Sequence, residues 1–389
     1  MPQSLIAALT LLLVGACSSA TPSPDTPLPH GSEDTATAQD PATPPQDLAP
    51  GEDGVPDDSH ARETTAPDDT QEDRAGEDTA QDDTDLSDAS DPSQDPVHAL
   101  CACLLGEEAA ADRRYTLAGP EITGRLPSSI PEASGMITSR HHPDVFWTHN
   151  DSGHRAELYA LSEDGTLLAT VAFPTLRNRD WEDIARGPCE GDEARDGCLY
   201  IGDIGDNRSV YESVLVHRWR ELDPRTLPPT LSVEADDVET AELVFPDGAR
   251  DTEALIVDPQ GRLWFLTKRP PTGHFRVYSA PFRPGERTTL TFHHQIPLSR
   301  SSLVGRLSMF TAADLHPRCN ALIGRYYGGG FLALLDRLDP DAIDEATLHS
   351  IPTGSERQGE AIAFTHDGYW HVGEADAAPI YRFRCTPTP

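Results

Sequence analysis

Two stretches of this 389-residue chain are variants of one unit: DTEALIVDPQGRLWFLT (residues 251–267) and QGEAIAFTHDGYWHVGE (residues 358–374). They align without a gap, and Glu253 and Glu360 fall at the same place. Each stretch has a short apolar run, a turn of the Asp-Pro-Gln-Gly or His-Asp-Gly kind, and a second apolar run. Such turns between short apolar runs predict β-hairpins. The chain is therefore expected to be all-β and built from copies of one hairpin.

Related segments occur at five places, which decides between the possible all-β folds. Aligned on one apolar position, they give the column Ser134, Glu182, Glu253, Ala312 and Glu360, with spacings of 48, 71, 59 and 48 residues. Repeats of this size, lengthened by insertions, are typical of β-propeller blades. We predict a propeller of five blades. Six is the alternative, if residues 220–250 contain a further blade.

The fifth unit ends after its third strand, at residues 380–384. The missing strand is expected from residues 115–124, which precede the first unit and would close the ring. In a propeller, the first strand of a blade begins at the rim where the second strand ends, here named the top. The closing strand would start at the bottom rim. With Arg113 as the marker of that start, whatever precedes the propeller joins it on the side away from the top.

The formal net charge of −35 is unevenly distributed, with 22 Asp or Glu and two Arg in residues 18–98. This charge argues against binding to nucleic acid and against a polybasic membrane contact. The first aromatic residue is Tyr115. A segment so charged and so poor in apolar residues does not offset the entropy lost on ordering. Residues 17–98 are therefore expected to form a disordered acidic linker, and residues 99–389 the propeller domain.

The N-terminus reads as an export signal, because residues 4–16, SLIAALTLLLVGA, are apolar but too short to span a membrane. Val14-Gly15-Ala16-Cys17 looks like a bacterial lipobox, in which the Cys is lipidated after cleavage. We expect residues 1–16 to be a lipoprotein signal peptide. Ser18 resembles the signal for sorting to an outer membrane. The pattern lacks a basic residue near Met1, so an ordinary secretory signal is the alternative.

The remaining cysteines are even in number, which favours disulfides in an exported chain. Cys189 and Cys198 bracket a short loop between two strands and are expected to pair. The pairing of the other four is left open, and all six are expected near the bottom rim; they are Cys101, Cys103, Cys189, Cys198, Cys319 and Cys385.

Polar side chains are predicted to converge on the top rim from two sides. The glutamates of the column begin first strands, and a second set of polar residues ends the second strands. Crowded carboxylates raise one another's pKa or hold a cation, and oxygen ligands suit Ca²⁺ better than Zn²⁺. The predicted ligands are Glu182, Glu253, Glu360, Asn150, Asp203 and Asp206.

The segments THNDSG (148–153), DWEDIA (180–185), YIGDIGDNR (200–208) and DTEAL (251–255) resemble a family of exported bacterial propellers of uncertain function. More distantly, they are similar to the SdiA-regulated and esterase-like phytase propellers. The resemblance covers about residues 125–385. It implies a propeller fold and an exported location, and its distant relatives include calcium-binding and ester-cleaving proteins. Ala312 stands where most units have Glu, so a ring of ligands would be incomplete there.

Three functions fit these features. The first is a monomeric, lipid-anchored module of the bacterial cell envelope that binds a small molecule or protein at its top face. The second is a metal-dependent hydrolase of phosphoesters, esters or lactones. There Glu182 or Glu253 would act as the general base, and Lys268 or Arg325 would hold a substrate anion. The third is a scaffold for another envelope protein. The sequence favours the first narrowly over the second.

Overall fold

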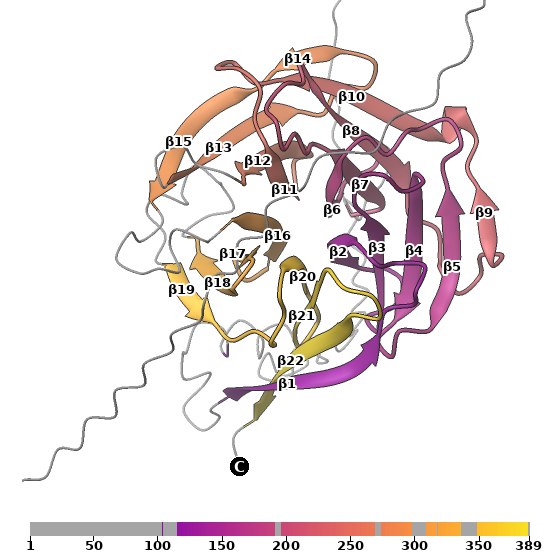
Figure 1. The fold of residues 1–389 in the computed structure, drawn as a ribbon, viewed down its shortest axis with the longest axis vertical. Helices are drawn as coiled ribbons and strands as arrows, with labels where there is room; N and C mark the ends of the chain where they lie inside the picture. The colour runs from indigo at the N-terminus through magenta and orange to yellow at the C-terminus, as the bar shows by residue number, and fades with distance from the viewer. Residues whose placement is uncertain are drawn as a thin grey trace, which may run out of the picture. The chain divides into compact units, whose positions relative to one another are not determined.

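The described residues form five sheets around a central axis, as expected of a five-bladed β-propeller (Figure 1). The computed structural model describes Cys103 and residues 115–190, 196–268, 274–297, 309–316, 318–335 and 348–387. The predicted signal peptide and linker, and the marker Arg113, lie outside these residues. Within them, no helix is long and apolar enough to cross a membrane.

Each blade has four antiparallel strands, numbered here from the axis outward. Blade 1 contains β2 (Ala133–Thr138), β3 (Val145–Asn150), β4 (Glu157–Ser162) and β5 (Leu167–Ala172). Blade 2 contains β6 (Trp181–Gly187), β7 (Cys198–Asp203), β8 (Val214–Arg220) and β10 (Val238–Val244). Blade 3 contains β11 (Thr252–Val257), β12 (Arg262–Thr267), β13 (His274–Pro281) and β15 (Thr291–Pro297). Blade 4 contains β16 (Phe310–His316), β17 (Ala321–Tyr326), β18 (Gly329–Leu334) and β19 (Leu348–Ile351). Blade 5 contains β20 (Gly359–Phe364), β21 (Gly368–Gly373), β22 (Pro379–Pro387) and β1 (Tyr115–Arg125).

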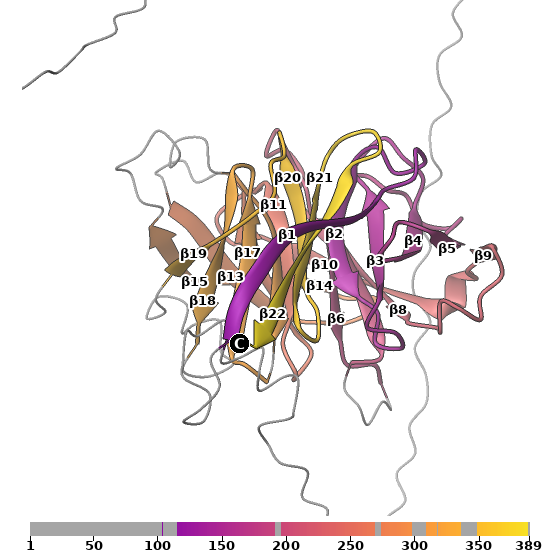
Figure 2. The same cartoon turned by 90° about the horizontal axis from the view of Figure 1, so that it is seen from below.

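The predicted closure is confirmed, because β1 is the outermost strand of blade 5 and pairs with β22 along its whole length. Tyr115 lies opposite Pro387, and Arg125 lies opposite Pro379. Since β22 runs down from the top rim, β1 starts at the bottom rim (Figure 2). The described part of the chain therefore begins on the side away from the first-strand glutamates.

The alternative of six blades is excluded by the strands in residues 220–250. There, β10 is the fourth strand of blade 2, and the short strand β9 (Thr230–Ser232) extends blade 1 by pairing in parallel with β5. A 3-10 turn at Ala235–Asp237 lies between them, and β14 (Arg287–Thr289) pairs in parallel with β10. The insertion therefore adds strands to blades 1 and 2 and does not form a sixth blade.

The core lies between the blades, because the inner strands are buried on both faces. This explains why their sequences are nearly continuous apolar runs without the alternation of a half-exposed strand. Trp147 and Trp370, both in second strands, are fully buried in separate clusters between neighbouring blades. Two aspartates at the axis join first strands to one another. Asp183 accepts the backbone N–H groups of Leu255 and Ala313, and Asp314 accepts that of Phe364.

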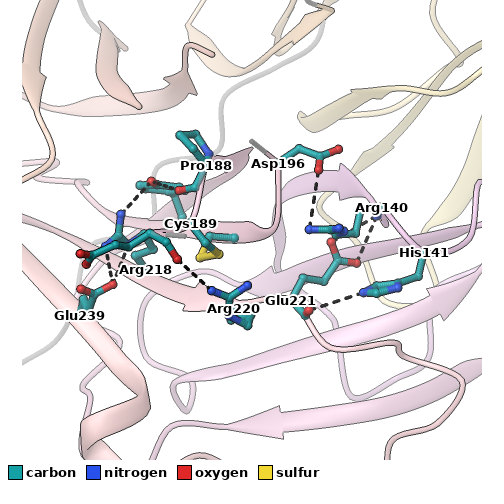
Figure 3. Close-up of a disulfide and its surroundings, with 12 residues drawn as sticks. Arg140, His141, Pro188, Cys189, Asp196, Arg218, Arg220, Glu221 and Glu239 are labelled. Atoms are coloured by element: carbon teal, nitrogen blue, oxygen red, sulfur yellow. Dashed lines mark hydrogen bonds and ion pairs between the residues drawn. A yellow bond between two sulfur atoms is a disulfide. The ribbon is translucent and has the colours of Figure 1, made fainter. Parts of the chain in front are cut away.

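The predicted disulfide between Cys189 and Cys198 is present, with 5.2 Å between the Cα atoms (Figure 3). A second one joins Cys103 to Cys385, with 5.9 Å between the Cα atoms. It ties the segment before β1 to the bottom end of β22. Cys319 is also disulfide-bonded.

A buried carboxylate, Glu221, fastens blade 2 to blade 1 near the first disulfide (Figure 3). It accepts hydrogen bonds from Ser139 Oγ at 2.5 Å, Trp147 Nε1 at 2.9 Å and Arg140 N at 3.2 Å. Replacing Glu221 by Ala leaves these donors without their acceptor. We expect the free energy of unfolding, measured in urea, to fall by about 3 kcal/mol.

The matched control for this change is Glu212→Ala, since the Glu212 side chain is 90% exposed. Its effect is expected to stay within about 0.5 kcal/mol. If Glu221→Ala costs no more than Glu212→Ala, the carboxylate does not hold the two blades together.

Candidate acidic site at the channel mouth

A small cavity at the top of the central channel is lined by carboxylates from three blades and the loops around them. Its volume of about 20 Å³ leaves room for roughly one water molecule or one ion. The lining residues are Glu132, Ala133, Ser134, Asp151, Glu182, Glu253, Lys268, Gln358, Glu360 and Glu374.

Three of these glutamates enter the cavity from β-bulges at the start of first strands. The strands β6, β11 and β20 each pair with the second strand of their blade. In this pairing the register skips one residue, which has no partner on the second strand: Glu182, Glu253 and Glu360 respectively. A bulge leaves one residue unpaired and turns its side chain away from the usual direction. The structure thus brings together the three glutamates that the repeat alignment placed in one column.

The bulge also corrects that column in blade 4. The register there skips Thr311, whereas the alignment had placed Ala312 in the column. Thr311 Oγ1 donates to the carbonyl oxygen of Gly359 at 2.8 Å. Blade 4 still supplies no carboxylate. In blade 1 the skipped residue is Gly135, whose φ of +69° places it in the left-handed region.

Two aspartates that sequence reasoning missed complete the acidic site. Asp180 and Asp251 precede Glu182 and Glu253 by two residues, so each pair starts its blade as Asp-x-Glu. In blade 5 the same place holds Gln358, whose amide donates to both Glu360 and Glu374. The repeated Asp-x-Glu spacing at the start of two first strands was the signal in the sequence.

The residues directly after two second strands contribute a further carboxylate, Asp151 after β3, and the ammonium of Lys268 after β12. Lys268 is the single lysine among the 30 basic residues of the chain. Its Nζ forms an ion pair with Glu253, and both side chains are almost completely buried. The structure therefore places Lys268 inside the acidic cavity as a counterion.

Three predicted ligands and the predicted anion-binding arginine do not line the cavity. Asn150 binds backbone groups of Glu132 and Ser129. Asp203 accepts the N–H of Asp180, and Asp206 accepts that of Tyr211. Arg325 is buried in an ion pair with Glu356. All four positions shape the loops and strands around the mouth.

Burial raises the pKa of carboxyl groups that line the cavity or lie beside it. The pKa of Glu360 rises to about 7, and that of Asp180 to about 6. Glu182 and Glu253 have a pKa well above the usual range, because desolvation dominates and other carboxylates are close. Burial acts to lower the pKa of Lys268, but Glu253 and Glu182 outweigh it and raise it. The site thus disfavours negative charge that no cation balances.

The carboxylates form two overlapping groups that share Glu182. Oxygens of Asp151, Asp180 and Glu182 lie within 4.8 Å of one another, and so do those of Glu182, Asp251 and Glu253. Within the described part of the chain, Glu182 Oε1 and Glu253 Oε2 are buried without a hydrogen-bond partner. Such a set of hard oxygen ligands around a space of atomic size fits a divalent cation of the Ca²⁺ class.

The chain has a low similarity to several solved structures of other proteins. No family model and no curated protein matches the sequence. Among solved structures, a luciferin-regenerating enzyme matches with a TM-score of 0.37 and 10% identity, over 70% of this chain and 95% of its own. A virginiamycin B lyase from Staphylococcus aureus matches with a TM-score of 0.32 and 10% identity, over 70% and 99% of the two chains. The periplasmic gluconolactonase of Pseudomonas aeruginosa matches with a TM-score of 0.32 and 12% identity, over 60% and 65%. These three proteins are β-propellers, and all three TM-scores lie below 0.5.

Proposed function

We propose that this protein is a binding module whose channel mouth holds a divalent cation, with Ca²⁺ as the first candidate. The observation that carries the proposal is Glu182, a buried carboxylate that belongs to both acidic groups and has an oxygen without a hydrogen-bond partner in the described chain. A cation bound there would neutralise carboxylates whose charge burial otherwise disfavours. The distant resemblance to calcium-binding propellers agrees with this function.

The cellular setting is part of the same proposal. Lipidation at Cys17 would anchor the protein in the bacterial cell envelope, in an outer membrane, through the acidic linker. Because β1 begins at the bottom rim, the acidic mouth can then face away from the lipid. Replacing Cys17 by Ala should move the protein from the membrane fraction to the soluble fraction. An unchanged distribution would refute the anchor.

A hydrolase is the second candidate, and one observation favours it. Glu360 has a pKa of about 7, which suits a general acid or base at neutral pH. The cavity volume of about 20 Å³ argues against it, because no substrate fits beside the cation without rearrangement. A screen of phosphoester, ester and lactone substrates with and without Ca²⁺ separates the two functions. Turnover that requires Ca²⁺ and Glu360 would establish the hydrolase.

The cation is tested by thermal melting in chelator and in Ca²⁺. At a Ca²⁺ concentration of about 100 Kd, linkage predicts a gain of about 2.7 kcal/mol, or roughly 5–10 °C in Tm. The double variant Glu182→Gln/Glu360→Gln should lose this gain, because it removes two carboxylates and leaves the Lys268–Glu253 pair intact. Element analysis after dialysis gives an independent measure of bound metal.

Glu212→Gln and Glu286→Gln together form the matched control, since both side chains are largely exposed. This control should keep the full Ca²⁺ response. An equal response in the cavity variant and the control would place any bound Ca²⁺ elsewhere and would contradict the proposal.

A further inference from the structure

A second hollow of the top face lies beside the acidic mouth and has the opposite charge. It is a groove of about 560 Å³ between the segments 153–157 and 172–179, which belong to the top loops of blade 1. That volume lies within the range of small-molecule sites, in contrast to the ion-sized cavity at the axis. The lining residues are Gly153, His154, Arg155, Ala156, Glu157, Ala172, Phe173, Pro174, Leu176, Arg177, Asn178 and Arg179.

The groove carries an excess of positive charge in a chain of net charge −35. Arg155, Arg177 and Arg179 all line it, and Glu157 is the one acidic residue of the lining. The Glu157 carboxylate already accepts the hydroxyl of Tyr159 at 2.8 Å. His154 is engaged with Glu132 at 2.8 Å. Arg155 is the ion-pair partner of Glu157, with 3.9 Å between Nη1 and Oε1. Three arginines and one glutamate still leave the lining a formal charge of +2.

The loops that form the groove are held in place before any ligand binds. Asn178 Nδ2 donates to the carbonyl oxygens of Asn150 and Asp151 at 3.0 and 2.9 Å, and Asn178 Oδ1 accepts the N–H of Trp181. The Arg179 guanidinium lies 4.2 Å from the centre of the Tyr211 ring, and its Nε lies 3.7 Å from Asp203 Oδ1. A site whose walls are fixed loses less entropy when it binds.

Asn178 also separates the groove from the mouth. The loops that line the groove also carry Asp151 and Asp180, but the carboxylates of these two residues gather with Glu182 at the axis. The carboxylates of the mouth would repel an anion, whereas the arginines of the groove would attract it. The remaining wall of the groove is apolar, with Ala172, Pro174 and Leu176 partly or fully exposed. Such a surface suits the carbon skeleton of a ligand better than a bare inorganic ion.

We infer that this groove binds a small organic carboxylate, with the anionic group on Arg155, Arg177 and Arg179 and the apolar body on Ala172, Pro174 and Leu176. The planar guanidinium forks match a carboxylate with paired hydrogen bonds. This site is separate from the proposed cation site, and it gives the top face a ligand class of its own.

The test uses 4-phenylbutyrate and its uncharged analogue 4-phenylbutyramide, titrated into the full chain after bound metal and then the chelator have been removed by dialysis, and followed by calorimetry. The carboxylate should bind at least about tenfold more tightly than the amide, as expected for charge-assisted hydrogen bonds. Arg155→Gln/Arg177→Gln should remove this preference. Arg283→Gln, which removes an exposed arginine on blade 3, should keep it. Because these arginines lie at the surface, circular dichroism should show both variants folded.

Other outcomes would overturn the inference. Equal binding of the acid and the amide would show a merely apolar groove, and inorganic phosphate binding as tightly as the acid would show that the apolar wall is not used. No binding at about 10 mM, a concentration far above most small-molecule Kd values, would also overturn it. Since the titration is done on metal-free protein, failure here leaves the cation proposal unaffected, and loss of the Ca²⁺ response leaves this result unaffected.

Discussion

Replacing Lys268 by Met is expected to lower the free energy of unfolding in chelator at pH 8 by about 3–5 kcal/mol, the usual cost of removing one partner from a buried ion pair. Lys268 and Glu253 are both almost fully buried, and the pair lies among further carboxylates. Met fills a similar volume, so the loss would come from the missing charge and not from a cavity. Urea denaturation of the wild type and the variant gives the difference.

Ca²⁺ should change the size of this loss. If the cation binds among the carboxylates that Lys268 now neutralises, the variant gains more from Ca²⁺ than the wild type does. The two proteins should then differ by less in saturating Ca²⁺ than in chelator. The Ca²⁺ affinity of the variant should also be higher, because no ammonium competes for Glu253.

Arg283→Met is the control for removal of a basic residue from an ion pair. Both Arg283 and Glu286 are more than half exposed, so the expected loss is below about 1 kcal/mol. A loss in Lys268→Met that is the same in chelator and in Ca²⁺ would show that the ammonium is a structural counterion with no connection to a metal.

The propeller itself was predictable because its signals are local. A hairpin needs a turn with particular residues between two apolar runs, and the repeat of that pattern at blade-sized spacing indicates one fold. The closing strand followed from counting strands, since the fifth unit had three. The insertion in blade 2 was harder to interpret, because β9 and β10 give the pattern of a hairpin although they belong to different blades.

The site was predicted in part, and the reasons are physical. Glu182, Glu253 and Glu360 share a position in the repeat, and a repeated position in a propeller becomes a ring around the axis. Asn150 and Asp203 end second strands and Asp206 follows one. Polar residues at strand ends often bind nearby backbone N–H groups, as these three do. A bulge shifts the register by one residue without changing the apolar pattern. For this reason the alignment puts Ala312 in the column, although the bulge of blade 4 lies at Thr311.

The second large effect is the change of the free energy of unfolding with pH, and it depends on the protonation of Glu360. Its pKa lies at about 7 in the folded protein, above the ordinary value of 4.5, because the group is buried. Between these two values the folded chain keeps a proton that the unfolded chain releases. The resulting stabilisation is complete below about pH 4.5 and is lost as the pH rises through about 7. For this one group it amounts to roughly 3 kcal/mol.

Buried histidines oppose this trend, so the wild-type curve alone is insufficient. Burial lowers the pKa of His149, His217 and His316 to about 4 each, and their contribution to stability is lost as the pH falls below about 6.5. The useful quantity is the difference between the wild type and Glu360→Gln. The histidines cancel in it, and Gln keeps the acceptor for the amide of Gln358.

In chelator, this difference should shift by about 2–3 kcal/mol in favour of the variant between pH 5 and pH 8. In saturating Ca²⁺ the shift should largely disappear, because the cation keeps the carboxylate deprotonated at both pH values and the unfolded chain is deprotonated there as well. Chemical denaturation at four or five pH values, for both proteins and both conditions, measures the two slopes. A difference that is constant with pH in chelator would mean that Glu360 ionises as an ordinary carboxylate. A shift in Ca²⁺ as large as the shift in chelator would remove Glu360 from the set of cation ligands and leave it a proton-holding group at the mouth.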